Sequence, residues 1–221
     1  DFYFVIDMDY DAVNGVLYAA TRKGLYASNN GGSSFTPKLT GSGSDVNCAD
    51  IEIGYTNPTT IYATFGIFEE AAIWRSIDAG NSFALNISQA NMGRIEMAVS
   101  KSNPGVIYAS FADLSTFGTG LMGVTTNAGD NWFSINVPGP SYSGASTYTG
   151  GQAWYDNILA VDPDNANVLL AGGIDNWKST NAGTNWIQKT NWYSETGSPP
   201  YAHADQHSMA FAPSNSNVVY L

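Results

Sequence analysis

The sequence predicts an all-β protein with the architecture of a β-propeller, in which small four-stranded antiparallel sheets, called blades, repeat along the chain. Three features predict this fold: an eight-residue motif occurs four times, a short apolar strand precedes each copy, and turn-forming residues separate the strands. No long segment shows helical periodicity. Four short strands in a repeat of about 50 residues are typical of a propeller blade.

The eight-residue motif has hydroxyl, Asx, glycine and aromatic positions in one register, and its copies start 48, 49 and 54 residues apart. The hydroxyl and Asx side chains can bond the backbone of a tight turn, and glycine allows a positive φ. We therefore expect the motif to close the turn between the third and fourth strands of a blade, with the aromatic side chain packed between sheets. The residues that carry it are Ser28, Asn30, Gly32 and Phe35; Ser76, Asp78, Gly80 and Phe83; Thr125, Asn127, Gly129 and Trp132; and Ser179, Asn181, Gly183 and Trp186.

The second recurring element is an apolar strand that ends in an aromatic or aliphatic residue and a small one. It occurs at residues 16–19, 60–63, 106–109, 168–171 and 218–221. Short strands at 47–53, 94–99, 157–161 and 207–211 precede the last four copies, with Pro and Asn turns between. The predicted blades are 1–42, 43–90, 91–138, 150–192 and an incomplete fifth at 203–221. About four and a half blades in one partial propeller predict a fragment of a larger propeller, whose remaining blades come from the same polypeptide or another chain.

Charge and composition exclude some functions. The 221 residues include 19 acidic and 8 basic side chains, for a net charge of −11, so a nucleic acid would be repelled. There is no apolar run long enough to insert into a membrane. Charged residues make up only 12% of the chain, a balance typical of secreted β-rich proteins. Because Cys48 is the single cysteine, no intrachain disulfide can form and the fold must depend on packing.

The four motifs resemble the Asp-boxes, or bacterial neuraminidase repeats, of sialidase-like and sortilin-type β-propellers. Two copies carry Asn-Ala-Gly and one carries Asn-Gly-Gly where that family prefers Asp-x-Gly. The resemblance implies that the motifs are structural and lie at the blade periphery. Residues 154–163, 177–183 and 203–213 are similar to propellers in large secreted surface proteins of Bacteroidetes-like bacteria, which implies an extracellular or cell-surface location.

The stretch from 150 to 211 interrupts the regular spacing and holds both histidines. His203, Asp205 and His207 alternate, so on a strand all three side chains would face one side. Three interpretations remain open: hydrogen bonds that order a long loop, a site for a divalent metal or another ligand, and general acid–base catalysis. No cofactor is expected, with a divalent metal as the alternative.

Aromatic residues gather in the same third of the chain. Trp154, Tyr155 and Asp156 are predicted to begin the inner strand of the fourth blade, and Trp192 lies nearby in sequence. Aromatic rings beside carboxylates and amides are typical of sugar-binding clefts, although packing between blades also demands aromatic residues. Trp154, Tyr155, Asp156, Trp192, His203, Asp205 and His207 are therefore the predicted ligand-binding residues.

The favoured function is a noncatalytic extracellular module that binds a protein or a glycan through its axial face and long loops. The alternative is a glycoside hydrolase resembling xyloglucanases, with Asp156 and Asp205 as an inverting carboxylate pair. Sialidase activity is not favoured, because a sialidase needs three arginines at the substrate carboxylate. Arg75, one of the three in this chain, precedes a motif in a peripheral strand, and the Arg-Ile-Pro motif is missing. Asp7, Asp9 and Asp11 alternate like calcium ligands, but the EF-hand pattern fails and we expect an ordinary turn there.

Overall fold

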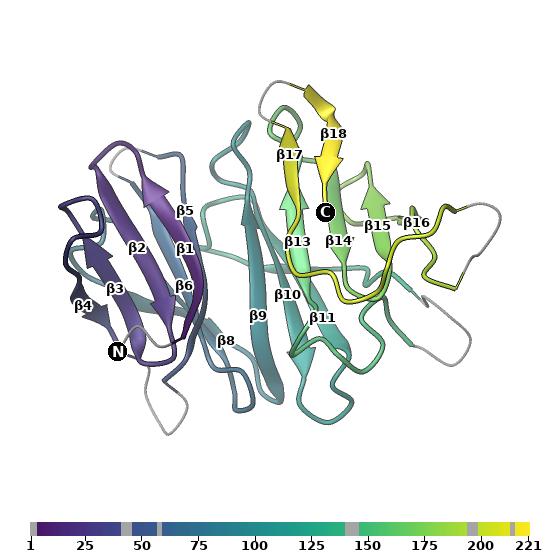
Figure 1. The fold of residues 1–221 in the computed structure, drawn as a ribbon, viewed down its shortest axis with the longest axis horizontal. Helices are drawn as coiled ribbons and strands as arrows, with labels where there is room; N and C mark the ends of the chain where they lie inside the picture. Colours follow the sequence, from purple (N-terminus) through teal and green to yellow (C-terminus); the bar gives the residue numbers. More distant parts are fainter. Residues whose placement is uncertain (1–3, 41–45, 57–58, 140–145, 194–198, 213–214) are drawn as a thin grey trace. The chain divides into compact units, whose positions relative to one another are not determined.

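The computed structural model describes residues 4–40, 46–56, 59–139, 146–193, 199–212 and 215–221, and these residues form strands and turns (Figure 1). Within them there are four four-stranded antiparallel sheets and one two-stranded sheet, so the predicted all-β fold with propeller-type blades is confirmed. Each four-stranded sheet is a meander in which consecutive strands pair, because short turns join them. The described residues include no helix that is long and apolar enough to cross a membrane.

The chain divides into two compact units, which meet in sequence after Ile95. Unit 1 contains two sheets. The first has the strands β1 (Val5–Asp11), β2 (Val16–Thr21), β3 (Gly24–Ser28) and β4 (Thr36–Leu39), and the second has β5 (Cys48–Ile53), β6 (Ile61–Phe65), β7 (Ala72–Ser76) and β8 (Ala84–Ser88).

Unit 2 holds the remaining sheets, and its first strand, β9 (Met92–Val99), begins in the last residues of unit 1. The third sheet continues with β10 (Ile107–Asp113), β11 (Thr119–Thr125) and β12 (Phe133–Ile135). The fourth comprises β13 (Ile158–Val161), β14 (Leu169–Gly172), β15 (Asn176–Ser179) and β16 (Ile187–Gln188). The last two strands, β17 (Ala210–Ala212) and β18 (Asn215–Tyr220), pair with each other.

The four eight-residue motifs form the same turn between the third and fourth strands of their sheets. In the second sheet, Ser76 Oγ accepts a hydrogen bond from Gly80 N at 2.9 Å and donates one to Asp78 Oδ1 at 2.7 Å. Asp78 Oδ1 also accepts from Ser82 N at 2.9 Å. The other turns repeat these bonds with asparagine in place of Asp78.

Two successive residues in each turn have left-handed backbone. The second is always glycine, and the first is Gly31 in one copy but alanine at Ala79, Ala128 and Ala182, with φ of 55–56°. An alanine in this region costs roughly 1–2 kcal/mol. The side-chain hydrogen bonds around the turn offset that cost, since they hold the backbone in one conformation.

The sheets within each unit pack face to face. In unit 1, Tyr18, Ala20 and Leu25 of the first sheet contact Ile51, Ile61 and Ala63 of the second in one apolar cluster. Carboxylates on the inner strand add to the interface: Asp7 Oδ2 accepts from Ile51 N at 3.2 Å, and Asp9 Oδ2 accepts from Ile53 N at 2.9 Å.

Asp11 ends β1 and caps the turn that follows. Its Oδ1 accepts from Val13 N and Asn14 N, and its Oδ2 accepts from the Asn14 side chain at 2.7 Å. The alternating carboxylates of β1 therefore serve the backbone, as expected for an ordinary turn.

Unit 2 contains a buried polar network beside its apolar cluster. The Tyr148 hydroxyl donates to Asn157 Oδ1 at 2.5 Å and lies 2.9 Å from Ser110 Oγ. Burial raises the pKa of the Tyr148 hydroxyl, so it stays protonated and remains a donor. Because Asn157 also donates to Ser110 O at 3.3 Å, the network joins the start of β13 to β10.

Acid titration should reveal the one turn that carries an aspartate at its Asx position. Hydrogen bonds from Ser82 and Ser76 lower the pKa of Asp78 from 3.8 to about 2. A carboxylate with a lowered pKa stabilises the fold above its unfolded pKa, and this contribution disappears as the pH falls towards about 2. We expect Asp78→Asn to flatten the loss of stability between pH 4 and 2 in denaturant titrations, because three natural turns already use asparagine. An unchanged slope would contradict this role.

The glycine positions of the turns should differ in how much stability is lost when alanine replaces glycine. A Cβ on Gly183 would lie 2.5 Å from Ile135 Cδ1, whereas a Cβ on Gly31 would meet nothing within 4 Å. Gly183→Ala should therefore lower the free energy of unfolding by about 1–3 kcal/mol through overpacking, in addition to the strain of a left-handed alanine. Gly31→Ala is the matched control and should cost that backbone strain alone, roughly 1–2 kcal/mol, as in the three turns that carry alanine there. Equal losses in urea unfolding would show that packing does not distinguish the two sites.

Candidate functional site

Three segments of unit 2 come together at one end of the fourth sheet. In the register of this sheet, Ile158 pairs with Gly172, and Gly172 pairs with Asn176. The residues before β13 and the turn after β14 therefore lie at the same end. The segment before β17 joins them, because Gln206 N donates to Gly173 O at 3.0 Å.

These segments enclose a pocket of about 500 Å³. This volume is within the range of roughly 300–1,000 Å³ that is usual for ligand sites. The walls combine aromatic rings with hydrogen-bonding groups. The lining residues are Gln152, Ile174, Trp192, Tyr201, His203, Ala204 and Asp205.

The structure brings Trp192, His203 and Asp205 together at the pocket, but not in the predicted geometry. The prediction that residues 203–207 form a strand with three polar side chains on one face is wrong, since β17 begins only at Ala210. Asp205 has a φ of 68°, which breaks the two-residue alternation of a strand. The physical reason is the hydrogen bond of Gln206 N to Gly173 O, which ties this segment to the β14–β15 turn instead of a ladder.

The histidines have separate surroundings. His203 Nδ1 lies 2.7 Å from Ala204 O, and because a carbonyl only accepts, this ring nitrogen is the donor. The His207 ring packs edge-on against Tyr155, with the ring centroids 4.4 Å apart. Among the residues that the structure describes, no group of three or more His, Cys, Asp or Glu side chains is arranged to hold a metal ion, and this includes His203, Asp205 and His207.

The prediction that Trp154, Tyr155 and Asp156 begin a strand is wrong, since they lie in a turn and β13 starts at Ile158. The turn is closed by Tyr155 N and Asp156 N, which both donate to Gln152 O. Trp154 and Tyr155 remain partly exposed, with their ring centroids 5.5 Å apart. Together with the His207 ring, which packs against Tyr155, they form an aromatic surface.

Asp156 has no exposed surface, in contrast to its two aromatic neighbours. Its charge contributes to the raised pKa of Tyr148, which places the carboxylate beside the buried network. The predicted pair of Asp156 and Asp205 is therefore divided between the interior and the pocket wall. Asp205 carries the one carboxylate among the described residues that line the pocket.

Asp175 is a residue that sequence reasoning missed. It lies in the β14–β15 turn, fully buried, and accepts hydrogen bonds from Trp192 N at 2.8 Å and Gln188 Nε2 at 3.1 Å. Burial raises its pKa from 3.8 to about 6. In the sequence it resembles any acidic turn residue, since nothing in the local pattern shows that Trp192 N bonds to it. Gln152, Ile174 and Tyr201 were also not predicted as site residues.

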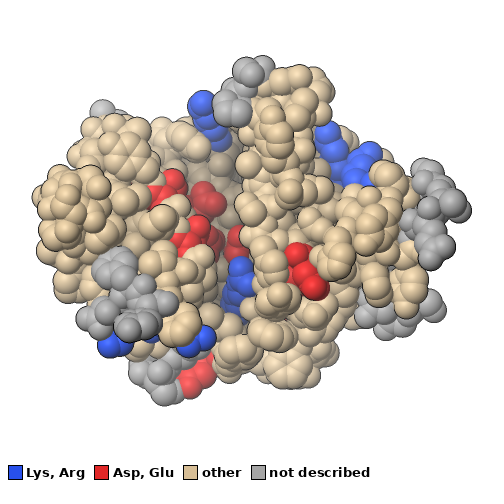
Figure 2. Space-filling model, in the orientation of Figure 1, with Lys and Arg blue, Asp and Glu red and all other residues tan. Residues whose placement is uncertain are grey.

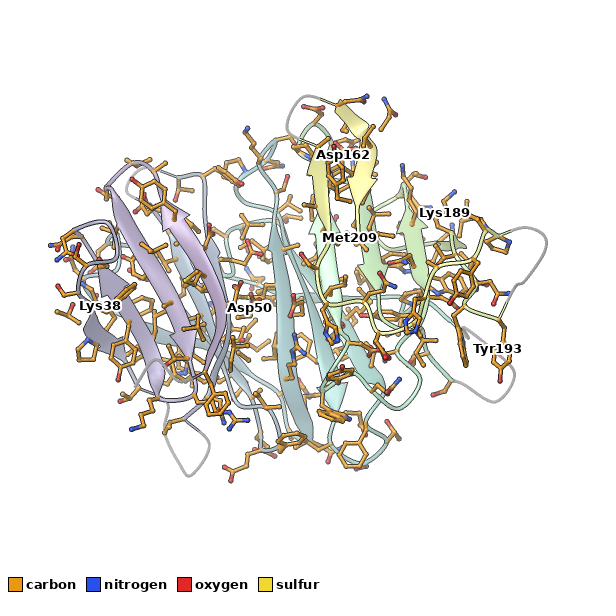
Figure 3. All side chains as sticks on the ribbon, viewed as in Figure 1. Lys38, Asp50, Asp162, Lys189, Tyr193 and Met209 are labelled. Carbon is orange, nitrogen blue, oxygen red and sulfur yellow. The ribbon has the colours of Figure 1, made fainter. Side chains whose placement is uncertain are left out.

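The surface around the C-terminal strands of unit 2 is mostly uncharged, as Figure 2 shows over β17 and β18. The Tyr193 ring packs against the Trp192 ring, with the two centroids 4.1 Å apart, and extends the aromatic surface. Figure 3 labels Tyr193 and also Met209, which stands directly before β17. An uncharged aromatic surface suits a neutral ligand better than a nucleic acid or a strongly charged partner.

Comparison with solved structures identifies the fold as that of β-propellers. A GH74 enzyme from Niastella koreensis superposes on 96% of this chain with a TM-score of 0.67 and 21% identity, and a GH74 xyloglucanase from Xanthomonas campestris on 80% with a TM-score of 0.60 and 20% identity. A nidogen/laminin complex matches 84% of the chain with a TM-score of 0.57 and 14% identity, over 63% of that chain.

The chain spans 34% and 28% of the two GH74 proteins, about a third of their length. No protein-family model matches the chain, and no curated protein matches it in sequence. The likeness therefore concerns the fold.

The Asp175 carboxylate should make the stability of the protein depend on pH. A raised pKa means that the folded state binds a proton more tightly than the unfolded state, so stability falls as the pH rises from about 4 to about 6. Asp175→Asn should remove this decline and should raise the melting temperature above pH 6, relative to the wild type. A pH profile of melting temperature that is the same for both proteins would contradict the assignment.

Proposed function

We propose that this chain is a noncatalytic carbohydrate-binding β-propeller module that receives a glycan at the pocket of unit 2. The observation that carries the proposal is the pocket itself, in which the Trp192 and Tyr201 rings stand beside the polar side chains of Gln152, His203 and Asp205. Aromatic rings pack on the C–H faces of sugars, while amides and carboxylates bond to hydroxyls. The low charge of the surrounding surface supports a neutral ligand.

The Asp175 carboxylate stabilises the wall of the pocket through its contact with Trp192. It holds the Trp192 backbone through a hydrogen bond to a charged acceptor, and such bonds are stronger than neutral ones. The hydrogen bond fixes the Trp192 backbone before a ligand arrives, so less conformational entropy is lost on binding.

Binding is favoured over hydrolysis because of the carboxylates. Inverting hydrolysis uses two carboxyl groups about 6.5–9.5 Å apart, with both in contact with the substrate or its water. Asp205 lines the pocket, whereas Asp156 and Asp175 are fully buried. A single accessible carboxylate supports recognition of a sugar hydroxyl.

A second candidate function is glycoside hydrolysis, with xyloglucan as the substrate. The likeness to GH74 structures favours it, including the one described as a xyloglucanase. Under this alternative Asp205 is one carboxylate of a pair, and the second belongs to a part of the protein other than the pocket walls described above.

We also infer an extracellular or cell-surface location and membership of the Asp-box, sialidase-like and sortilin-type propellers. The four identical turns and the low fraction of charged residues support both. Further blades and protein ligands are the other partners expected, since a propeller of similar fold occurs in the nidogen/laminin complex.

A glycan array followed by titration calorimetry tests the proposal, with xyloglucan oligosaccharides among the ligands. We expect saturable binding that falls at least tenfold in Trp192→Ala and in Tyr201→Ala, because each variant removes a stacking surface. Phe133→Ala, an exposed aromatic residue on β12 outside the pocket lining, is the control and should bind as the wild type does. Equal affinity in all four proteins would overturn the pocket as the binding site.

Release of reducing sugar from xyloglucan distinguishes the two functions. The binding module should release none above the buffer control. Turnover that disappears in Asp205→Asn, while the variant keeps its melting temperature, would show a glycoside hydrolase instead.

A further inference from the structure

Unit 1 contains a second pocket, of about 270 Å³, which lies between its two sheets and beside the eight-residue turn of the second sheet. Comparison of this pocket with the same place in the other pair of sheets shows how it arises. In unit 2, the equivalent space between the third and fourth sheets is filled by an apolar cluster. The same four repeat positions occur in both units: Val106, Tyr108, Val124 and Ala182 pack together with Ile135 in unit 2, and Val16, Tyr18, Ala27 and Ala79 line the pocket with Lys38 in unit 1.

The strand registers support this equivalence. Tyr18 pairs with Ala27, which pairs with Thr36, and Tyr108 pairs with Val124, which pairs with Phe133. The registers then differ. Ile135 pairs with Met122, but in the first sheet Leu39 pairs with Leu25, and Lys38 stands at a bulge between Pro37 and Leu39.

Two differences open the pocket. Ala27 is smaller than Val124, and a bulge brings Lys38 to the pocket, whereas Ile135 places its Cδ1 close to Gly183 in unit 2. A lysine keeps its ammonium group in water instead of filling an apolar gap. Lys38 lies on β4 and is labelled in Figure 3.

Fixed amide groups add hydrogen-bonding capacity to this pocket. Asn14 Nδ2 donates to Asp11 Oδ2 at 2.7 Å and to Thr59 Oγ1 at 3.1 Å, and Asn81 Nδ2 donates to Asp78 O at 2.6 Å. Because these NH₂ groups are engaged, the amide oxygens of Asn14 and Asn81 are the atoms left to accept from a ligand.

The other lining residues supply apolar surface, a hydroxyl group and one cation. Val16, Ala27 and Ala79 give an apolar floor, and the hydroxyl of Tyr18 lies 3.5 Å from Ala79 O. Lys38 supplies the one cation among the described lining residues, and they include no carboxylate. The floor suits the C–H face of a sugar ring, the amide oxygens suit its hydroxyls, and the ammonium suits a carboxylate.

We propose that the pocket between Lys38 and the turn at Ala79 binds one acidic sugar residue, a hexuronic acid. The volume of about 270 Å³ is just below the usual range for drug-sized ligands, so the occupant is small. Lys38 carries the one charge among the described lining residues, and its ammonium is the group that would bind an anionic ligand, against the charges of Asp11 and Asp78, which act on the lining residue Tyr18. This site uses residues other than those of the proposed glycan pocket in unit 2, so the two proposals are tested independently.

Titration of the complete 221-residue chain with sodium glucuronate tests the proposal, with glucose as the neutral comparison. We expect saturable glucuronate binding that is at least tenfold tighter than glucose binding and that weakens as salt is added. Lys38→Ile should reduce the glucuronate affinity at least tenfold. The same variant should keep the melting temperature of the wild type, because Lys38 is exposed and stands at a bulge.

Two further variants keep the test decisive. Lys101→Ile removes the same charge from an exposed turn in unit 2 and should leave glucuronate binding unchanged. Asn81→Asp places a carboxylate in the pocket and should also lower the affinity at least tenfold, which provides a second probe if Lys38→Ile does not fold.

Nuclear magnetic resonance spectra locate the bound ligand. Glucuronate should shift the methyl resonances of Val16 and Ala79 and leave the Trp192 indole resonance in place. The proposal is overturned if glucuronate does not bind, if Lys38→Ile binds it as tightly as the wild type, or if the shifts appear at Trp192 alone.

Discussion

The structure depends on a backbone constraint that is repeated four times: two successive left-handed residues, held by one hydroxyl and one Asx side chain. This turn joins the third strand of each sheet to the fourth and brings its glycine close to the neighbouring sheet. At Gly80 a Cβ would lie 2.3 Å from the Tyr18 hydroxyl oxygen, and at Gly183 it would lie 2.5 Å from Ile135 Cδ1. The turn therefore sets the spacing between sheets within a unit as well as the path of its own chain.

Because the scaffold is repeated, differences between copies identify the places where the protein does something other than fold. Ile135 packs into the cluster between the third and fourth sheets, whereas a bulge in the first sheet brings Lys38 to the lining of a pocket. The long segments before β13 and β17 likewise depart from the repeat, and they form the pocket of unit 2 together with the β14–β15 turn. Function on such a fold resides in the departures, since the regular positions are occupied by packing and turn closure.

The candidate site was predictable as a region but not as a geometry. Trp192, His203 and Asp205 were chosen for their chemistry, and they do line one pocket. The extended conformation expected at 203–207 fails because Gln206 N bonds to Gly173, a residue far away in sequence. Asp156 looked like a surface carboxylate beside two aromatic residues, yet it is buried next to Tyr148. Alternation and neighbouring residue types do not reveal which side of a turn faces the interior.

The sequence by itself determined the repeat, the all-β class and the turn between the third and fourth strands of each sheet, because the hydrogen bonds of that turn form within eight consecutive residues. Only the tertiary structure decided which separate segments meet, and with them the burial of Asp175, its hydrogen bond to Trp192 N and the pocket beside Lys38. These properties depend on contacts between residues far apart in the chain. Desolvation, packing volume and pocket shape arise from such contacts and are not carried by any single segment.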